Sequence, residues 1–392
     1  MRIAFFSNFL NHHQLPICQE FLKSEGVEFV FVATKEIEQS RLEMGYKDMN
    51  EFPFVLRAYE GELERQKAME IAETYDVVVL GAAPIAYLKN RMKGNKLTFR
   101  FCERPLKKGT WRRFIPKTKK RLNETYIQYK DNNLYVLGAS AYTSSDLALC
   151  GFPKEKCFRW GYFPAIENRD VDKLLAGKKA NDKVEILYAG RLLKLKRVGD
   201  TVKALHYLQK KGVCNFHFTI IGDGAEKQNL YNYVKKYNLG GYIDFLPFMK
   251  PEEVRKYMDK TDIYVFGSNF YEGWGAVVNE AMNSACALVV SHAVGSAAYL
   301  IDKNKNGIVY QCGDVKSLAK FLETLIINEE LRLDIGRNAY QTITSKWTAK
   351  TAVERFLMLC GKLSRGENYL DDYSDGPCSK ADIIKNKWVN KR

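Results

Sequence analysis

The chain has 392 residues, of which 46% are hydrophobic and 27% are charged, with a formal net charge of +15. Since a single hydrophobic core stops growing at roughly 250–300 residues, this length predicts two domains. The composition is typical of a globular protein, and no apolar run approaches the roughly 20 residues of a membrane span, so an integral membrane protein is excluded.

The first half of the chain begins with a strand pattern rather than a signal peptide, because the apolar run after Arg2 is short and soon meets polar residues. Apolar and β-branched runs then alternate with helical stretches, which is the pattern of βα units. The strands predicted here are 3–6, 28–32, 76–80, 97–101 and 134–137.

A strongly basic segment interrupts this alternation. Residues 89–121 hold fourteen lysines and arginines against one acid, Glu103, so they carry +13 of the net charge. Trp111, Phe114 and Ile115 are interleaved with these cations, a mixture that favours an anionic membrane surface or an anionic lipid-linked acceptor. A featureless surface is the alternative. Nucleic-acid binding is not expected, because no recognised nucleic-acid motif accompanies the charge.

The domain boundary is predicted in the polar stretch 165–182, which has no strand pattern. The second half resumes the alternation, with strands predicted at 184–189, 216–221, 243–245, 263–266, 287–290 and 308–310. The sequence therefore predicts an α/β protein with two doubly wound parallel sheets. Residues 1–165 and 166–347 form the two domains, and residues 348–392 add a last helix and a polar tail.

In the last segment Thr348 is predicted to cap the N-terminus of a helix and Gly361 to end it. The remainder, 362–392, is polar and is expected to be loosely attached, or to form a short docking helix over 381–392.

Nine cysteines occur singly, without CxxC pairs, and favour reduced thiols in a cytoplasmic protein, so the sequon at Asn123 is attributed to chance. The positions of these cysteines are 18, 102, 150, 157, 214, 286, 312, 360 and 378.

Basic residues follow the first strand of the second half, in "YAGRLLKLKR". Gly190 and Arg191 end that strand, and Lys196 stands beside a helix start, which is where an open α/β sheet binds phosphate. A solvated basic turn is the alternative. In "IIGDG", Gly222 and Gly224 permit either close approach to a ligand or an ordinary turn.

The stretch "YEGWGAVVNEAM", residues 271–282, places two glutamates beside a glycine loop and a helix start. Gly273 and Gly275 expose backbone N–H groups that could hold a phosphate or a sugar hydroxyl. Glu272 and Glu280 could each accept hydrogen bonds from a vicinal diol. The alternative is a helix end with two surface charges.

The order "GRLLKLK", "IIGDG", "FLPF", "DIYVFGSNFYEGWGAVVNEAM" and "HAVGS" resembles the nucleotide-sugar domain of retaining glycosyltransferases of family 4. The resemblance is clear over 184–359 and fainter before it. It implies the GT-B fold, in which two Rossmann-like domains face each other across a cleft. The first would bind the acceptor and the second the nucleotide-sugar, and the last helix, from about Thr348, would return to the first domain.

The resemblance also implies roles for single residues. Arg191 and Lys196 match the family's R-x4-K pair, which stabilises the leaving diphosphate. Glu272 and Glu280 match E-x7-E, whose first glutamate faces the donor sugar and whose second binds the ribose. The donor site implied in this way also includes Gly190, Gly222, Gly273, Trp274, Gly275, Ala276 and Val277.

The first domain departs from the family. The histidine that usually follows its fourth strand is missing, and Cys102, Glu103 and Arg104 stand there instead. Site residues are therefore sought in "SNFLNHHQLP", where Asn11, His12 and His13 follow the first strand, and at Glu103. A structural role in a helix start, or surface ion pairing for Glu103, is the alternative.

These features together favour a hexosyltransferase that uses a nucleoside diphosphate-sugar and a glycan or lipid-linked acceptor, in the cytoplasm or on the inner face of the membrane. No metal or other cofactor is expected, because Arg191 and Lys196 can offset the diphosphate charge. "DVD" at 170–172 only mimics a metal motif, since it lies in the linker. A non-catalytic binding protein and a nucleotide-sugar epimerase are the alternatives.

Overall fold

The computed structural model describes residues 1–43, 45, 47–370, 372–386 and 388–391. They form two compact units: Met1–Ala165 with Trp347–Lys385, here the first domain, and Ile166–Lys346 with Asn386–Arg392, the second domain. The sequence assigned everything from 348 onward to one segment, whereas in the structure this segment passes from the first domain to the second after Lys385.

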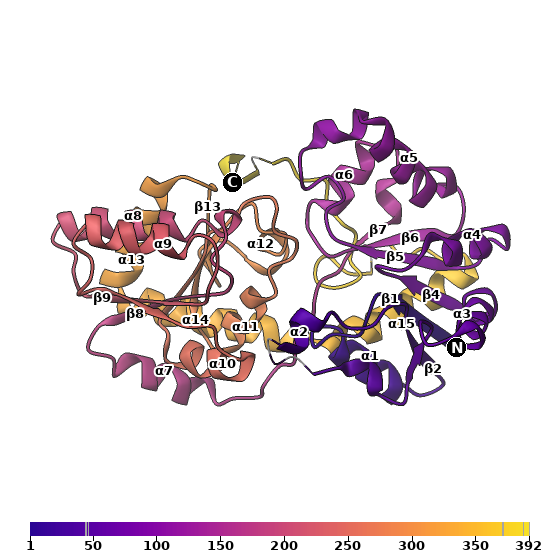
Figure 1. Ribbon diagram of the computed structural model, residues 1–392, viewed down its shortest axis with the longest axis horizontal. Helices are drawn as coiled ribbons and strands as arrows, with labels where there is room; N and C mark the ends of the chain where they lie inside the picture. The colour runs from indigo at the N-terminus through magenta and orange to yellow at the C-terminus, as the bar shows by residue number, and fades with distance from the viewer. Residues whose placement is uncertain (44, 46, 371, 387, 392) are drawn as a thin grey trace. The chain divides into compact units, whose positions relative to one another are not determined.

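The first domain alternates strands and helices along the chain (Figure 1). Its strands are β1 (Arg2–Ser7), β2 (Glu28–Ala33), β3 (Val55–Arg57), β4 (Val77–Leu80), β5 (Thr98–Cys102), β6 (Leu134–Gly138) and β7 (Cys157–Arg159). Its α-helices are α1 (Leu15–Lys23), α2 (Gln39–Glu43), α3 (Glu62–Thr74), α4 (Ile85–Lys93), α5 (Pro116–Thr125), α6 (Thr143–Ala148) and α15 (Ala349–Arg365). Short 3₁₀ turns are η1 (Met49–Glu51), η2 (Thr110–Phe114), η3 (Ile127–Tyr129) and η4 (Lys154–Lys156).

All seven strands of this sheet are parallel to their neighbours, in the order β3-β2-β1-β4-β5-β6-β7. The five strands predicted from the sequence are present. The outer strands β3 and β7 were missed because each has only three residues, too few to show a period.

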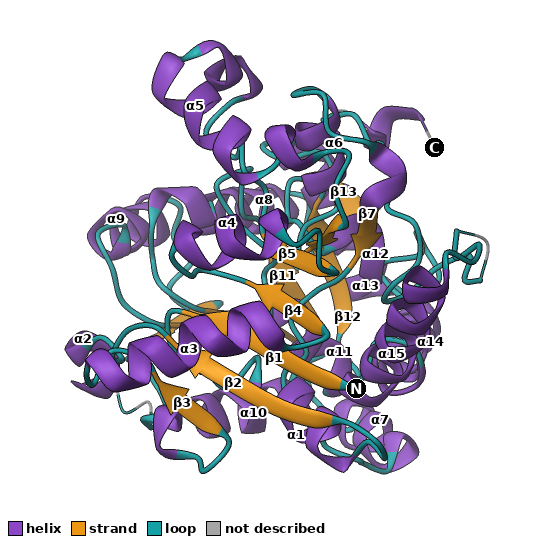
Figure 2. Ribbon diagram, turned by 90° about the vertical axis from the view of Figure 1, so that its right-hand side faces the viewer, coloured by secondary structure: helices purple, strands orange, loops and turns teal. Residues whose placement is uncertain are grey.

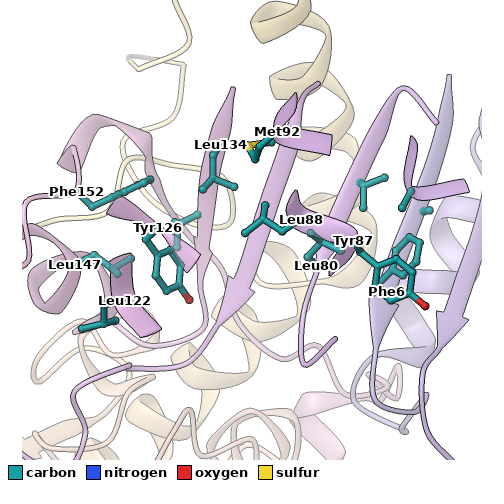
Figure 3. Packing of buried hydrophobic residues seen from close by; sticks show 14 of the residues in the cluster. Phe6, Leu80, Tyr87, Leu88, Met92, Leu122, Tyr126, Leu134, Leu147 and Phe152 are labelled. Atoms are coloured by element: carbon teal, nitrogen blue, oxygen red, sulfur yellow. The ribbon is translucent and has the colours of Figure 1, made fainter. Parts of the chain in front are cut away.

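Helices cover both faces of the first sheet, and alternate strand residues enter the two layers. On one face, α3 and α4 lie across the strands (Figure 2) and pack with Phe6, Leu80 and Leu134 (Figure 3). On the other face α1 lies against α15, and the Phe356 ring of α15 is 4.9 Å from that of Phe99 on β5. The last helix is therefore part of the first domain's core.

Two cations of the basic segment are buried, so not all of the charge counted in the sequence lies on the surface. Arg91 is 1% exposed, and its guanidinium donates to the carbonyls of Ala72 and Leu97, each at 2.7 Å. Arg104 forms a bidentate ion pair with Asp146, at 3.0 and 3.1 Å. These residues hold loops together, so the charge count overstated the exposed positive charge.

The C-terminal segment is not a loose tail. The α15 helix does begin after the cap Thr348, whose Oγ1 accepts the Thr351 N–H at 2.9 Å, but it passes through Gly361 and ends at Gly366 in the left-handed conformation. Lys380 then forms an antiparallel bridge with Phe158 beside β7. Backbone pairing to an edge strand, which polarity does not reveal, attaches this segment.

The second domain contains β8 (Val184–Ala189), β9 (Phe216–Ile221), β10 (Ile243–Leu246), β11 (Ile263–Phe266), β12 (Ala287–Ser291) and β13 (Ile308–Tyr310). Its helices are α7 (Val171–Lys179), α8 (Val198–Lys210), α9 (Lys227–Lys236), α10 (Pro251–Lys260), α11 (Val277–Asn283), α12 (Ala297–Leu300), α13 (Val315–Ile327) and α14 (Glu329–Ser345), with η5 (Lys194–Lys196) and η6 (Trp388–Lys391).

The second sheet is also parallel, in the order β10-β9-β8-β11-β12-β13, and contains all six predicted strands. The chain order reverses between β8 and β11, which is the topological switch point where open α/β sheets bind ligands. Among the described residues of the whole chain, no helix has the length and hydropathy of a membrane span.

The linker that precedes β8 is built into the second domain. Asp170 caps α7 by accepting the Lys173 N–H at 3.1 Å, and Asp172 pairs with Arg337 at 2.6 Å, so "DVD" has a structural role. The Lys178 ammonium is buried and donates to the carbonyls of Thr261, Ser284 and Ala285 at 2.6, 2.6 and 2.9 Å.

We predict that Lys178→Met lowers the free energy of unfolding of the second domain by about 3–5 kcal/mol, because three buried carbonyls lose a charged donor. Urea unfolding followed by circular dichroism measures this. Lys179→Met is the matched control: its exposed ion pair with Glu329, at 3.6 Å, should contribute less than about 1 kcal/mol. Equal stability of the two variants would contradict the prediction.

Candidate functional site

The loops that follow β8 and β9 approach each other backbone to backbone. The Gly190 N–H donates to the Ile221 carbonyl at 3.0 Å, and the Leu192 N–H donates to the Asp223 carbonyl at 2.7 Å. A Cβ at Gly222 would lie 2.1 Å from the Gly190 oxygen, and one at Gly224 would lie 2.4 Å from the Leu192 oxygen. Both glycines of "GDG" are therefore required by loop packing, whatever the ligand.

The β8 loop also contacts the loop after β11, on the other side of the switch point. The Asn269 N–H donates to the Leu195 carbonyl at 2.9 Å. Arg197 adopts the left-handed conformation, with φ +54°, and turns the chain from η5 into α8. These two constraints fix the position of the short turn that carries Lys196.

Two of the residues singled out in the sequence meet at this point. The Lys196 Nζ lies 2.5 Å from Glu272 Oε2, and each side chain is 14% exposed. The ammonium also lies 5.0 Å from the centre of the Phe266 ring. The structure thus brings a cation and a carboxylate, 76 residues apart in sequence, to the carboxyl edge of the sheet at the switch point between β8 and β11.

Arg191 is the second cation of the β8 loop, and its side chain is exposed. The Arg191 carbonyl accepts the Tyr188 O–H at 3.0 Å, which anchors the loop from the strand below. Burial raises the pKa of the Tyr188 phenol, and the nearby Glu272 raises it further, so the phenol stays protonated as a donor. The backbone at Arg191 is held while its guanidinium can reach a ligand.

The glycine loop after β11 is fixed by a second backbone pairing. The Gly273 and Trp274 carbonyls accept the N–H groups of Gly295 and Ser296, both at 3.1 Å. The Trp274 side chain is 1% exposed and donates from Nε1 to Asn279 at 2.9 Å, so it belongs to the core and only its backbone could face a donor. Gly275 has φ +82°, and a Cβ there would meet Phe266 at 2.8 Å.

The helix predicted after this loop is α11, which Ala276 caps and Val277 begins. Glu280 lies in its first turn and is partly exposed. Arg255 of α10 donates to the Glu280 carbonyl at 3.4 Å and to the Asn283 side chain at 3.3 Å, which braces the helix from behind. The carboxylate of Glu280 therefore projects from a fixed short helix.

In the first domain the candidate residues occupy the equivalent edge. Asn11, His12 and His13 follow β1, next to the switch point between β1 and β4, and all three are partly exposed. The His13 N–H donates to Asn11 Oδ1 at 3.0 Å, and the His12 and His13 ring centres are 3.8 Å apart. This contact is compatible with either the site role or the structural role.

Tyr162 connects these residues to Glu103, which directly follows β5. The Tyr162 O–H donates to Glu103 Oε1 at 3.1 Å, and its ring centre lies 5.8 Å from that of His13. Glu103 also lies 3.5 Å from the Lys107 ammonium, so its partners are a tyrosine and a lysine rather than the neighbouring arginines. The sequence analysis missed Tyr162, because nothing in "RWGYFP" distinguishes it from the other aromatic residues.

Comparison with known proteins adds independent information. Residues 172–342 match the family model described as "Glycosyl transferases group 1". The second domain matches a glycosyltransferase family. The matched segment contains both Arg191 and Lys196 and both Glu272 and Glu280, and it covers less than half of the chain.

The curated relatives are similar over parts of their length. An α-1,4-N-acetyl-D-galactosaminyltransferase from Campylobacter jejuni, named for a PP-undecaprenol-linked glycan, is 33% identical over 156 residues, 40% of this chain and 42% of that protein. The amylovoran biosynthesis glycosyltransferase AmsK from Erwinia amylovora is 28% identical over 197 residues, 48% of this chain and 47% of that protein. The matches thus span about half or less of these relatives.

A solved structure extends the likeness to both domains. HepE from Anabaena, crystallised with UDP, covers 92% of this chain and 100% of its own, with a TM-score of 0.69 and 17% identity. This level of similarity shows the fold, which is that of GT-B glycosyltransferases, and the predicted fold class of two Rossmann-like domains is confirmed.

We predict that Gly222→Ala lowers the free energy of unfolding of the second domain by about 2–4 kcal/mol, since its Cβ meets a carbonyl that cannot move without displacing the β8 loop. Gly177→Ala is the control. It lies in α7 with no atom within 4 Å of a Cβ, so it should be neutral or stabilising by up to about 1 kcal/mol. Denaturant midpoints compare the two, and an undiminished midpoint for Gly222→Ala would refute the packing role.

Proposed function

We propose that the chain is a retaining glycosyltransferase of family 4, which transfers a hexose-type sugar from a nucleoside diphosphate-sugar to an acceptor hydroxyl. The observation that carries the proposal is the Lys196–Glu272 pair, which lies at the switch point of the domain matching the group 1 family. The acceptor proposed is a lipid-linked or cell-surface polysaccharide precursor, in keeping with the names of the two curated relatives.

This site is best suited to stabilising the leaving group of the reaction. Cleavage of the donor leaves an additional negative charge on the terminal phosphate of the diphosphate, and cations held in place before the reaction stabilise it most effectively. Lys196 is held by its turn and by the Phe266 ring, and Arg191 extends from the anchored loop beside it. A bound diphosphate would share the Lys196 ammonium with Glu272.

The remaining groups would orient the donor. Glu272 and the backbone of Gly273 would contact the donor sugar, and Glu280 would accept hydrogen bonds from the ribose hydroxyls. Both carboxylates are on segments that other contacts fix. The Glu272 N–H donates to the Asn269 carbonyl at 2.9 Å, and Glu280 belongs to α11. Asn11, His12, His13 and Glu103 are the candidates in the first domain for groups that face the reacting sugar.

We propose that transfer requires no divalent metal or organic cofactor. Two cations at the diphosphate position can neutralise charge that a metal ion neutralises in other nucleotide-dependent enzymes. Retention of the configuration at the anomeric carbon is proposed through the resemblance to family 4, and it is checked by the anomeric proton coupling of the product.

The decisive experiment measures nucleoside diphosphate release from a panel of UDP-, GDP- and ADP-sugars with oligosaccharide and lipid-linked acceptors. We predict that Lys196→Ala lowers kcat/KM at least about 100-fold, because a charge-assisted contact to the leaving group is lost. Lys194→Ala removes an exposed lysine from the same turn and should retain activity.

Three results would count against the proposal. Release that Lys196→Ala does not diminish would remove the diphosphate site from the second domain. A changed sugar without consumption of acceptor would indicate an epimerase. Binding of nucleotide without release from any donor and acceptor would indicate a non-catalytic protein.

A further inference from the structure

The first domain contains a hollow of about 820 Å³ between the end of β5, the loop that follows it, η2 and α5. Eight of its sixteen lining residues are lysine or arginine, and two are glutamate. We call this feature the cationic hollow. The lysines and arginines that line it are Arg100, Arg104, Lys107, Lys108, Arg112, Lys117, Lys120 and Arg121.

Helical spacing directs one face of α5 into the cationic hollow. Lys117, Lys120 and Arg121 are three and four residues apart, so they share a face, and all three line the hollow. Leu122 and Thr125 of the same helix are buried and also line the hollow, and Leu122 packs in the domain core near Leu147 (Figure 3). These core contacts of α5 fix the position of the three cations.

Four of the cations that line the hollow have no carboxylate partner. Lys108, Lys117, Lys120 and Arg121 form no ion pair with any residue that the structure describes. Like charges three and four residues apart on a helix also repel each other. An anion in the hollow would relieve this repulsion.

The loop after β5 that lines the hollow is held in place. Arg104 forms an ion pair with Asp146, and the Leu106 N–H donates to the same carboxylate at 2.9 Å. Arg100 also lines the hollow, and its buried Nε has no hydrogen-bond partner among the described residues.

Two exposed aromatic residues lie on η2, which borders the hollow through Arg112. Trp111 is 60% exposed and Phe114 is 71% exposed. The Arg113 guanidinium lies 4.3 Å from the Phe114 ring centre, and Gly109 makes room for the Trp111 indole, which a Cβ would meet at 2.6 Å. Aromatic side chains beside cations fit a ligand with one anionic and one apolar part.

We propose that the cationic hollow binds the diphosphate of a lipid diphosphate, with Trp111 and Phe114 in contact with its hydrocarbon chain. A diphosphate concentrates several negative charges in a volume that the hollow can enclose. A protein that binds an ordinary phospholipid surface would instead be expected to spread its cations over a convex face. The inference rests on the proposed function, because the lipid diphosphate is taken to carry the acceptor glycan.

The test is co-sedimentation of the full chain with phosphatidylcholine vesicles that contain a polyprenyl diphosphate. The comparison vesicles contain phosphatidylglycerol at equal negative charge. We expect preferential binding to the diphosphate vesicles, competed by inorganic diphosphate, and at least about tenfold weaker binding for K120Q/R121Q. K119Q/K130Q removes the same charge from exposed positions outside the hollow and should bind as the unchanged protein does.

Other outcomes overturn the inference. Equal binding to both vesicle types, or equal weakening by both double variants, would show general attraction to an anionic membrane. Failure of inorganic diphosphate to compete would exclude the hollow as the phosphate site. The thermal shift caused by the nucleoside diphosphate of the donor is measured on both double variants and on Lys196→Ala. We expect only Lys196→Ala to lose this shift. A shift that Lys196→Ala retains would contradict the second-domain site but not the hollow, so failure of one proposal can be told from failure of the other.

Discussion

The second domain depends on a contact that leaves no room for a side chain. The loops after β8 and β9 pair through their backbones, and a Cβ at Gly222 would lie only 2.1 Å from the Gly190 oxygen. This contact sets the path of the β8 loop, and the Leu195–Asn269 hydrogen bond joins it to the β11 loop. Lys196 and Glu272 meet because both of their loops are already fixed.

The position of this pair follows from sheet topology. The strand order reverses between β8 and β11, so the loops after these strands lie at the topological switch point, where open α/β sheets bind ligands. The same glycines that a motif search associates with phosphate binding are needed here for packing. A ligand contact would therefore be made by groups that the glycines position, above all Arg191 and Lys196, rather than by space at the glycines themselves.

The basic residues of the first domain have two different structural roles. Arg91 and Arg104 are buried and satisfied by carbonyls or by Asp146, so they stabilise loops. Lys117, Lys120 and Arg121 are held by α5 on the wall of a hollow without carboxylate partners. Each of these residues adds one positive charge to the sequence count, but only those of the second group are available to an anionic partner.

The sequence by itself determined the five longer strands of the first sheet, the six strands of the second, the fold class and the cap of α15, because periodicity and capping are local properties. It also selected Lys196 and Glu272, although their contact required the fold. Tertiary structure alone decided the edge strands β3 and β7, the attachment of residues 376–385 and the role of Tyr162, since each depends on partners distant in sequence. It also decided which cations are buried, because burial of an arginine depends on the carbonyls that the folded chain gathers around it.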